Sequence, residues 1–561
     1  MILQQLQRDA DRLVGEIPPP MYDRKPIRWV IDLRPDGTFV GWVPLSSGVD
    51  TRGDRGREML VPYVTRTSAT KPILLVDTPE YVLGRNEENP QRAEQRHQAF
   101  VELVERCAEQ TGLPSVQAVL TFLTSEALPD PPKEMDDRDL ITFRVAEALP
   151  VDHPKVQEFW ERHTADPRAR QLQCLVCGRT APAEPNLPVK IKGIPQGQPS
   201  GTQIVSANAD VFESYGLERA LTSPICRRCG ERFGKAINAL ISGENTSLRV
   251  GPVVYVFWSV DAPGFSPLSF LRAPDPGVVR DLIKSYATGK QISVEDTAAF
   301  YATALSASGG RAVVRDWLET TVGSVKNSLA RWFQLQSIVD WNGSPGPFLG
   351  VWDMARSLYR KADDIPAWVP KAMVSAALYG NPLPDSLLST ALQRNRADAE
   401  VTHARAAVMK AVLCQDMPSK EATRMTELDA TNRNPAYLCG RLLAVLESVQ
   451  RQAAPGIKAT IVDRFFGSAS SAPASVFGTL MRLSQSHLEK LRKTREPAYH
   501  ALQNRIESVL ADLEQFPSTL TLREQALFCL GYYHQRAADR KAARERSQIG
   551  TVEDEEVDAD E

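Results

Sequence analysis

The spacing of hydrophobic residues changes partway along this chain and predicts two kinds of region. Before about residue 365, short runs rich in β-branched and aromatic residues lie between glycines and prolines, which is typical of β-strands. Pro35-Asp36-Gly37-Thr38 joins the first two runs with a proline and a glycine, so we expect an antiparallel hairpin. The stretch from Gly277 to Ala304 mixes polar and apolar residues, and we expect it to be mostly helical. The strand-like runs are residues 27–33, 39–45, 251–260 and 311–317.

From about Ile365 onward, the strand-like runs give way to amphipathic segments separated by short breaks of proline, glycine and serine. Asn434-Pro435 provides a helix cap with a first-turn proline, Pro473 lies early in a second helix, and Thr521-Leu-Arg-Glu524 has capping-box spacing. Gly440 permits a close neighbouring helix. Helices of this kind pack economically as a bundle. The expected apolar faces are Leu438, Leu442, Val445 and Val449 in the first helix, and Val476, Phe477, Leu480, Leu488 and Leu491 in the second.

These patterns predict an α+β protein with a helical C-terminal part. We expect a mixed α/β region over residues 1–364 with an inserted four-cysteine zinc-finger lobe at about 170–235, followed by an all-α helical bundle over 365–545. In the remaining segment, 546–561, the last eleven residues carry seven carboxylates and no basic side chain. Without them the formal net charge of −3 becomes −3 + 7 = +4. The body is therefore mildly basic, and the acidic tail is expected to be disordered.

Two cysteine pairs, Cys174-Leu-Val-Cys177 and Cys226-Arg-Arg-Cys229, carry the strongest chemical signal in the chain. Four thiolates match a closed tetrahedral zinc site, whose role is structural because no coordination position is left for a substrate. Gly178 and Gly230 follow the pairs, and we expect both to adopt positive φ. A redox-active pair and two unrelated buried pairs remain as alternatives. The first pair is followed by three prolines, at positions 182, 185 and 188, where a redox pair would begin a helix.

The remaining cysteines are scattered through segments with helical patterns, which fits a reducing compartment better than a disulfide framework. No apolar run reaches membrane-spanning length, and the first apolar residues are followed at once by Arg8 and Asp9, unlike a signal peptide. We therefore expect a cytoplasmic location and no membrane partner. The four scattered cysteines are Cys107, Cys414, Cys439 and Cys529.

Motifs of enzyme active sites are weakly represented in this chain. It has no Walker-type phosphate loop and no HExxH sequence, and its seven histidines are not spaced with carboxylates as in a metal nuclease. His487 lies beside an apolar helix position and is more typical of a packing or surface residue than of a general base. These observations predict a protein that is not an enzyme.

Basic residues interleaved with hydroxyl, amide and glycine residues instead indicate nucleic-acid contacts, because small side chains and backbone amides approach phosphates closely. A solvated surface explains each of these clusters equally simply. For Lys493, which lies near the end of a predicted helix, stabilisation of the helix dipole is a further structural explanation. The candidate DNA-binding residues are Arg66, Lys71, Lys190, Lys192, Arg482 and Lys493.

The segment between the cysteine pairs, KIKGIPQGQPSGTQIVSANADVFESYG (190–216), resembles the large subunit of the type I-C CRISPR surveillance complex, Cascade. Further similar blocks occur in the same order as in that family, from Met1 to about Arg495, so the resemblance covers most of the chain. The blocks are MILQQL, IPPPMYDRKPIRWVIDL, VPYVTRTS, EYVLGR, FYATALSASGGRAVVRDW, RNPAYLCGRLLAVLESVQ and DRFFGSASSAPASVFGTLMRLSQSHLEKL.

The resemblance implies a non-catalytic subunit of an RNA-guided antiviral assembly. Such a subunit lies near the 5′ end of the guide RNA, recognises the protospacer-adjacent motif in target double-stranded DNA, helps to unwind the duplex and recruits a separate helicase-nuclease. Other implied partners are the backbone repeat subunit, the subunit at the guide 5′ end, a small subunit and the displaced single strand. Gln196, Gln198 and Ser200 have the small polar composition expected of minor-groove readers.

The resemblance also implies a small subunit translated from an internal start in the same gene. Lys420-Glu421 can be encoded as a ribosome-binding sequence three codons before Met425, so we expect a small-subunit-like fragment over 425–545 whose basic face binds displaced single-stranded DNA. An ordinary Lys-Glu pair on a helix surface is the structural alternative. For the whole chain, a zinc-dependent nucleic-acid-processing enzyme and a free-standing DNA-binding protein remain as alternative functions.

Overall fold

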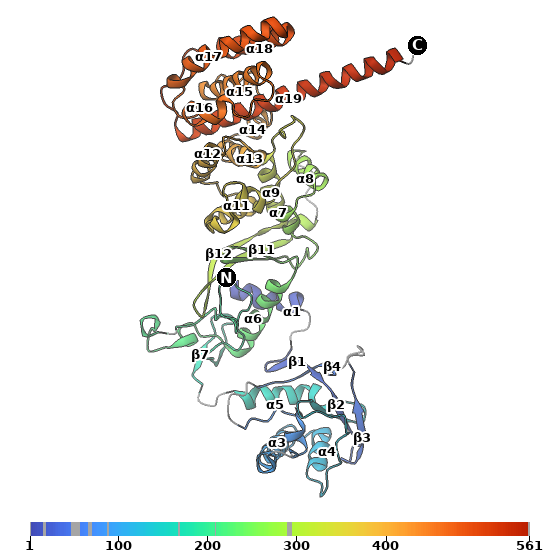
Figure 1. Ribbon diagram of the computed structural model, residues 1–561. Coiled ribbons are helices and arrows are strands. Elements are labelled where there is room, and N and C mark those ends of the chain that lie inside the picture. The colour runs from blue at the N-terminus through green and yellow to red at the C-terminus, as the bar shows by residue number, and fades with distance from the viewer. Residues whose placement is uncertain are drawn as a thin grey trace. The chain divides into compact units, whose positions relative to one another are not determined.

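The structure is a computed structural model that describes residues 2–14, 18–46, 56–64, 70–86, 89–165, 169–207, 209–288 and 294–558, with the backbone alone for 286–288 and 547–558. The chain forms two units: Met1–Ile191 with Ser200–Ala239, and Lys192–Pro199 with Leu240–Glu561. Figure 1 shows their elements, coloured along the chain. No helix within these described ranges is long and apolar enough to span a membrane.

The first unit contains a small mixed sheet of order β3-β2-β6-β5. Strand β2 (Trp29–Leu33) pairs antiparallel with β3 (Phe39–Pro44) and parallel with β6 (Ile141–Val145), which in turn pairs antiparallel with β5 (Val76–Asp77). The other elements are α1 (Ile2–Val14), β1 (Tyr22–Ile27), β4 (Arg57–Pro62), α2 (Pro79–Val82), α3 (Pro90–Thr111), α4 (Pro114–Leu123), η1 (Pro150–Asp152), α5 (Pro154–Thr164), β7 (Gln171–Gln173), β8 (Thr180–Pro182), η2 (Asp210–Phe212), η3 (Arg219–Thr222) and α6 (Arg227–Ser242).

Helices α3 and α4, which lie side by side in Figure 1, pack on this sheet through aromatic side chains. The ring centroid of Phe143 on β6 lies 6.3 Å from that of Phe100 on α3 and 6.2 Å from that of Phe122 on α4. All three rings are buried. Across the parallel pair, Arg144 on β6 donates two hydrogen bonds of 2.9 and 2.8 Å to the carboxylate of Asp32 on β2. The sheet is therefore fixed by apolar contact on one face and by an ion pair between neighbouring strands.

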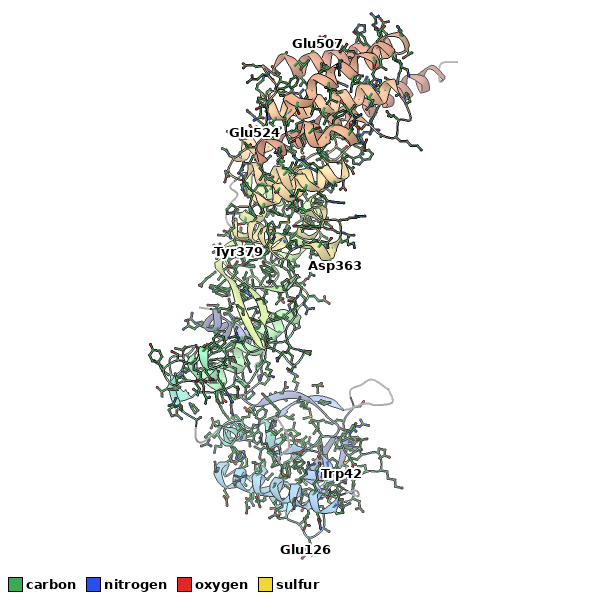
Figure 2. All side chains as sticks on the ribbon, turned by 60° about the vertical axis from the view of Figure 1, so that its left-hand side comes forward. Trp42, Glu126, Asp363, Tyr379, Glu507 and Glu524 are labelled. Carbon is green, nitrogen blue, oxygen red and sulfur yellow. The ribbon has the colours of Figure 1, made fainter. Side chains whose placement is uncertain are left out.

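The predicted hairpin is confirmed between β2 and β3. Arg34 N–H donates to Thr38 O at 2.9 Å, and Gly37 adopts φ +87° in the turn. The first strand is shorter than predicted, because Ile27 belongs to β1, which pairs with β4 in a separate two-stranded sheet. Trp42 of β3, labelled in Figure 2, donates from Nε1 to Asp130 O at 3.0 Å.

The second unit begins with an antiparallel sheet of order β12-β11-β10-β9. Its strands are β9 (Ser247–Val250), β10 (Val253–Trp258), β11 (Ala299–Ser308) and β12 (Arg311–Thr321), which confirms the strands predicted at 251–260 and 311–317. The expected helix over Gly277 to Ala304 is only half correct. Helix α8 (Pro276–Thr288) forms there, but residues from Ala299 onward are strand because β11 pairs with β10 on one side and β12 on the other.

Within the described residues that follow β12, the regular elements are helices. This confirms the helical part predicted from about Ile365 onward, and it begins earlier than predicted because α9 and α10 precede that residue. Asn434 caps α15 by accepting from the backbone of Ala436 and Tyr437. Thr521 N–H donates to Glu524 Oε2 at 2.7 Å at the start of α19; Glu524 is labelled in Figure 2. The predicted apolar residues of α15 and α17 are all buried. The elements, with those around the sheet, are α7 (Leu268–Arg272), η4 (Val294–Thr297), α9 (Val322–Gln336), α10 (Val351–Ser357), η5 (Ala362–Asp364), α11 (Trp368–Tyr379), α12 (Ser386–Asp398), α13 (His403–Cys414), α14 (Ser419–Arg424), α15 (Pro435–Ala453), α16 (Ile461–Ala469), α17 (Pro473–Thr494), α18 (Glu496–Ala511) and α19 (Leu522–Asp558).

A single hydrophobic core runs through this unit from Leu248 to Ala537. The structure thus divides the chain differently from the boundary expected at 364/365, because the sheet and the helices bury apolar surface against each other. At its centre, the buried side chain of Lys410 on α13 donates to the carbonyls of Gln334 and Leu335 at the end of α9, both at 3.0 Å. Helix α19 continues as helical backbone to Asp558, into the segment for which disorder was expected.

Candidate metal centre and nucleic-acid surface

The first cysteine pair lies in the turn of the β7–β8 hairpin. Cys174 follows β7, and its N–H donates to Arg179 O at 2.9 Å, while Gly178 N–H donates to Cys174 O at 2.8 Å. Gly178 adopts φ +74°, as predicted, because the chain reverses within a few residues to begin β8. This turn holds Cys174 and Cys177 close together.

The second pair lies at the start of α6. Cys226 forms an antiparallel bridge with Ala183, next to β8, and Cys229 follows in the first helical turn. Gly230 is helical, so the predicted positive φ at this position is wrong. Glycine is favoured there by space instead, because a Cβ atom would lie 3.1 Å from Cδ of Pro188.

The two pairs bring four sulfur atoms within 4.8 Å of one another. Cys226 N–H donates to Cys174 Sγ at 3.4 Å, and Cys177 Sγ lies 4.0 Å from Cys226 Sγ. A tetrahedral zinc ion with Zn–S bonds of about 2.3 Å separates its sulfur ligands by about 3.8 Å, so this donor set fits such an ion. Cys174 and Cys229 are buried, whereas Cys177 is exposed. The spacing predicted a four-cysteine cluster, and the structure confirms it.

Hydrogen bonding within the cluster separates the acidities of these thiols. The interaction with Cys229 lowers the pKa of Cys226, and the same interaction raises the pKa of Cys229. Burial raises the pKa of Cys177. Cys226 is therefore the first of these three thiols to ionise, and a bound cation would stabilise the remaining thiolates.

Helix α6 also contacts the stem of the glycine-rich loop, which we define as residues 190–201. A Cβ atom on Gly234 would lie 2.7 Å from Cβ of Val189, so the helix and the stem touch closely at this point. One turn further, Asn238 Nδ2 donates to Lys190 O at 3.0 Å. The helix that carries two metal-ligating cysteines thus supports the entry to the loop.

Two backbone hydrogen bonds of 2.8 Å between Ile191 and Thr202 close the base of the glycine-rich loop. Gly197 N–H donates to Ile194 O at 3.1 Å, and Gln196 between them has φ +60°, so the loop contains a tight turn. Every predicted site residue in this loop is exposed, namely Lys190, Lys192, Gln196, Gln198 and Ser200.

Part of the loop, Lys192–Pro199, belongs to the second unit. Within that unit, Gln198 lies beside the turn between β11 and β12, because a Cβ atom on Gly310 would be 3.4 Å from Gln198 Nε2. A Cβ atom on Gly193 would lie 2.9 Å from Cγ2 of Ile241. Residues 193 and 198 of the loop are therefore packed within the second unit, while the polar side chains of the predicted site residues stay exposed.

The other predicted basic residues occupy separate surfaces. Lys71 is exposed ahead of β5, and Arg66 lies outside the described residues. Arg482 and Lys493 are both exposed on α17, about three turns or about 16 Å apart along its axis, and so on one face. Lys493 Nζ lies 3.2 Å from the carboxylate of Glu489, which offsets part of its charge.

The structure adds a cluster of arginines that the sequence analysis did not identify. Neighbouring cavities of about 450 and 250 Å³ share Gln452, Arg505 and Arg546 among their lining residues and lie between α15, α18 and α19. We call this surface the arginine groove. Its arginines are Arg451, Arg495, Arg505, Arg536, Arg540 and Arg546, and its carboxylates among the described lining residues are Glu447 and Asp539.

Positive charge exceeds negative charge in the arginine groove. Glu447 accepts from Arg451 at 2.8 Å and lies 3.3 Å from Arg536, while Arg505 lies 3.3 Å from Asp539. Burial raises the pKa of Asp539, while Arg505 and the hydrogen bond from Gln535 act in the opposite direction. The arginines come from α15, from the junction of α17 and α18, and from α18 and α19. The one signal for them in the sequence was the i, i+4 spacing of Arg536 and Arg540 along α19.

Two histidines on the C-terminal helices, His534 and His487, lie apart from the cysteine cluster. His534 is buried 2.9 Å from Tyr437 Oη, and burial lowers its pKa to about 3. His487 lines a cavity of about 570 Å³ between α15, α16 and α17, together with Leu446 and Phe465. Among the residues that the structure describes, the four cysteines are the group of metal-binding side chains close enough to share an ion.

Comparison with known families identifies the chain. Residues 3–539 match the family model described as CRISPR-associated protein (Cas_Csd1). No curated protein matches the chain. The family match extends from the start of α1 into α19, and so includes the four-cysteine cluster, the glycine-rich loop and the helices of the arginine groove. The chain therefore belongs to the CRISPR-associated Cas_Csd1 family, the generally non-catalytic large subunits of type I-C Cascade complexes.

Proposed function

We propose that this chain acts in the cytoplasm as a non-catalytic subunit that recognises the protospacer-adjacent motif in target double-stranded DNA, helps to unwind the duplex and recruits a helicase-nuclease. Its partners in the complex are the guide RNA, the backbone repeat subunit, the subunit at the guide 5′ end and a small subunit. Membership of the Cas_Csd1 family supports this proposal.

The glycine-rich loop carries the proposal for DNA reading. Its base is closed by hydrogen bonds, its turn is tight, and Gln196, Gln198 and Ser200 are exposed on it. Amide and hydroxyl groups on a narrow, well-supported loop suit the minor groove, where acceptors and one donor distinguish A·T from G·C pairs. Lys190 and Lys192 on the same loop are placed to contact phosphates.

The metal that fits the cluster best is Zn²⁺, held by Cys174, Cys177, Cys226 and Cys229. A zinc ion bound by these four thiolates would crosslink the β7–β8 hairpin to α6 and would have no free coordination position for a substrate. Its role is therefore structural. The contacts of Gly234 with Val189 and of Asn238 with Lys190 transmit that support to the glycine-rich loop.

Sequence-independent DNA contacts come from basic side chains on other surfaces. Lys71, with Arg66, would contact duplex phosphates, and Arg482 and Lys493 on α17 would contact the displaced strand. The arginine groove supplies a denser array of guanidinium groups on the same helical region, which favours a single strand held through its phosphates.

A small subunit translated from Met425 would contain the helices from α15 to α19 (Figure 1). Helix α15 packs against α16, α17, α18 and α19, so the fragment keeps most of its own apolar contacts. Met425 itself is buried in the full chain. Intact-mass measurement of complex expressed from the unmodified gene should show a chain that begins at Met425. This start is wrong if that chain persists after synonymous recoding of Lys420-Glu421 with Met425→Leu.

Binding isotherms of the purified complex on duplexes with and without the motif test the proposed function, together with a nuclease assay of the chain in magnesium. We expect tighter binding to the motif-bearing duplex and no cleavage. Cleavage that depends on the cysteine cluster would instead show a zinc-dependent nucleic-acid-processing enzyme. Motif binding by a chain that copurifies with neither a short RNA nor other subunits would show a free-standing DNA-binding protein.

A further inference from the structure

The lobe that carries the cysteine cluster ends in an exposed apolar tip, which we define as residues 209–218. Val211 is 83% exposed and Tyr215 is 98% exposed, and Phe212 between them is 45% exposed. Single exposed apolar residues are common on protein surfaces, but three within five positions form a patch. Such a patch is typical of a surface that becomes covered by a partner.

The tip is held in one conformation by backbone hydrogen bonds. Ala207 and Arg219 exchange two of these, at 3.1 and 3.0 Å, on either side of the tip. At its end, Ser214 and Leu217 exchange two more, at 3.2 and 2.9 Å, and Arg170 Nη1 donates to Gly216 O at 3.3 Å. A partner would therefore meet a tip whose backbone is already folded, which lowers the entropic cost of binding.

The turn at the end of the tip contains backbone strain at an aromatic residue. Tyr215 has φ +53° and Gly216 has φ +66°, so both central residues of the turn are left-handed. This turn type favours asparagine, aspartate or glycine at its first central position, and a bulky side chain there is costly. Because the Tyr215 ring is 98% exposed, packing within the chain does not compensate for that cost.

The charge around the tip decides between classes of partner. Asp210, Glu213 and Glu218 contribute three carboxylates to the tip, and the basic side chains beside it are Arg219, which follows the tip, and Arg170, which donates to Gly216 O. The carboxylates outnumber these two arginines, so the net charge disfavours a nucleic acid. A protein surface with an apolar pocket bordered by lysine and arginine would complement it.

We propose that the 209–218 tip docks another protein subunit of the complex, with Tyr215 and Val211 inserted into an apolar pocket and the three carboxylates facing basic residues on its edge. This inference rests on the proposed function, because the partner is a subunit of the same assembly. It assigns the tip to protein assembly, whereas the neighbouring glycine-rich loop is assigned to DNA.

The test is co-expression of the full set of subunits with guide RNA, purification through a tag on the backbone repeat subunit, and measurement of the fraction of complexes that contain the large subunit. Tyr215→Gly removes the ring and relieves the positive φ, and a second variant combines Val211→Ser with Tyr215→Ser. Val40→Ser is the matched control, because Val40 is 56% exposed on β3 of the same unit and lies outside the four-cysteine cluster. The unfolding temperature and metal content of each isolated variant are measured in parallel.

We expect both tip variants to weaken retention of the large subunit by about tenfold or more, with unchanged metal content and with Tyr215→Gly no less stable than wild type. The control should be retained like wild type. Full retention of both tip variants overturns the inference and leaves the proposed function intact. Tip variants that are retained normally but no longer bind duplex DNA have the same two consequences. Failure of the wild-type chain to enter the complex overturns both.

Discussion

Gly440 of α15 lies so close to α19 that a Cβ atom at this position would come within 1.9 Å of the carbonyl oxygen of Phe528. The approach is reciprocal, because a Cβ atom on Gly531 of α19 would lie 2.2 Å from the carbonyl oxygen of Tyr437 on α15. The two helices therefore meet backbone to backbone, and their crossing depends on both glycines.

Gly440→Ala should destabilise the protein by about 3 kcal/mol or more, because the added methyl group meets rigid backbone rather than a flexible side chain. Gly478→Ala on α17 is the matched control, since no atom lies within 4 Å of its added Cβ. That change should be neutral or stabilising by up to about 1 kcal/mol, because alanine favours helix over glycine. Denaturant unfolding followed by circular dichroism measures both, and equal stability of the two variants would contradict this account of the crossing.

Cys174→Ser and Cys226→Ser should each remove the bound metal and loosen the glycine-rich loop without affecting any chemical step. Elemental analysis of freshly purified protein measures the first effect, and protease sensitivity of residues 190–216 measures the second. Cys107→Ala, at a buried cysteine outside the cluster, should retain the metal. A wild-type chain with less than about half an equivalent of zinc or iron would argue against a structural metal site.

Substitution of Gln196, Gln198 and Ser200 by alanine should reduce the preference for motif-bearing duplexes by about tenfold or more, since base-edge hydrogen bonds carry discrimination. Arg66→Ala with Lys71→Ala should weaken binding to all duplexes and lower the salt dependence instead. Isotherms on matched and scrambled duplexes at two salt concentrations separate these effects. Unchanged discrimination in the triple variant would place the reader on another segment.

Arg495→Gln combined with Arg546→Gln should weaken binding of single-stranded DNA and reduce the salt slope by about 0.7 for each phosphate that is no longer neutralised. Arg495, between α17 and α18, and Arg546, on α19, line the groove and take no part in the ion pairs with Glu447 and Asp539 described above. Arg482→Gln with Lys493→Gln provides the comparison on α17. A larger loss of affinity in the α17 pair would assign the single strand to the α17 face.

Acid should destabilise the protein through His534. Burial lowers its pKa to about 3 in the folded state, whereas an unfolded chain has a histidine pKa of about 6.5. Between these values the unfolded state binds a proton that the folded state does not, so stability falls as pH drops below about 6.5, by about 1.4 kcal/mol per pH unit. Burial also lowers the pKa values of His163 and His403.

Denaturation midpoints at pH 7, 6 and 5 for wild type and His534→Gln isolate this contribution. The variant should be less stable at pH 7, because it loses the hydrogen bond with Tyr437, yet its stability should fall less steeply with acid. Parallel curves would show that His534 does not control the acid response.

Local sequence determined those parts of the fold that depend on neighbouring residues. The turn at Gly37, the cap at Asn434 and the capping box at Thr521 rest on hydrogen bonds within a few positions, and each formed as predicted. The CxxC spacing also determined local structure, because a short turn brings the two cysteines of each pair together. The sequence also contained the residue blocks that resemble the type I-C large-subunit family, and the match over residues 3–539 confirms membership of that family.

Tertiary structure decided the features that depend on contacts between distant segments. Residues from Ala299 are strand because β10 and β12 pair on both sides, and Gly230 is needed for space beside Pro188 rather than for its φ angle. The arginine groove exists because three helices converge, and one core joins sheet and helices across residue 365. Strand pairing and burial gain their free energy from residues far apart in the sequence, so no local pattern contains that information.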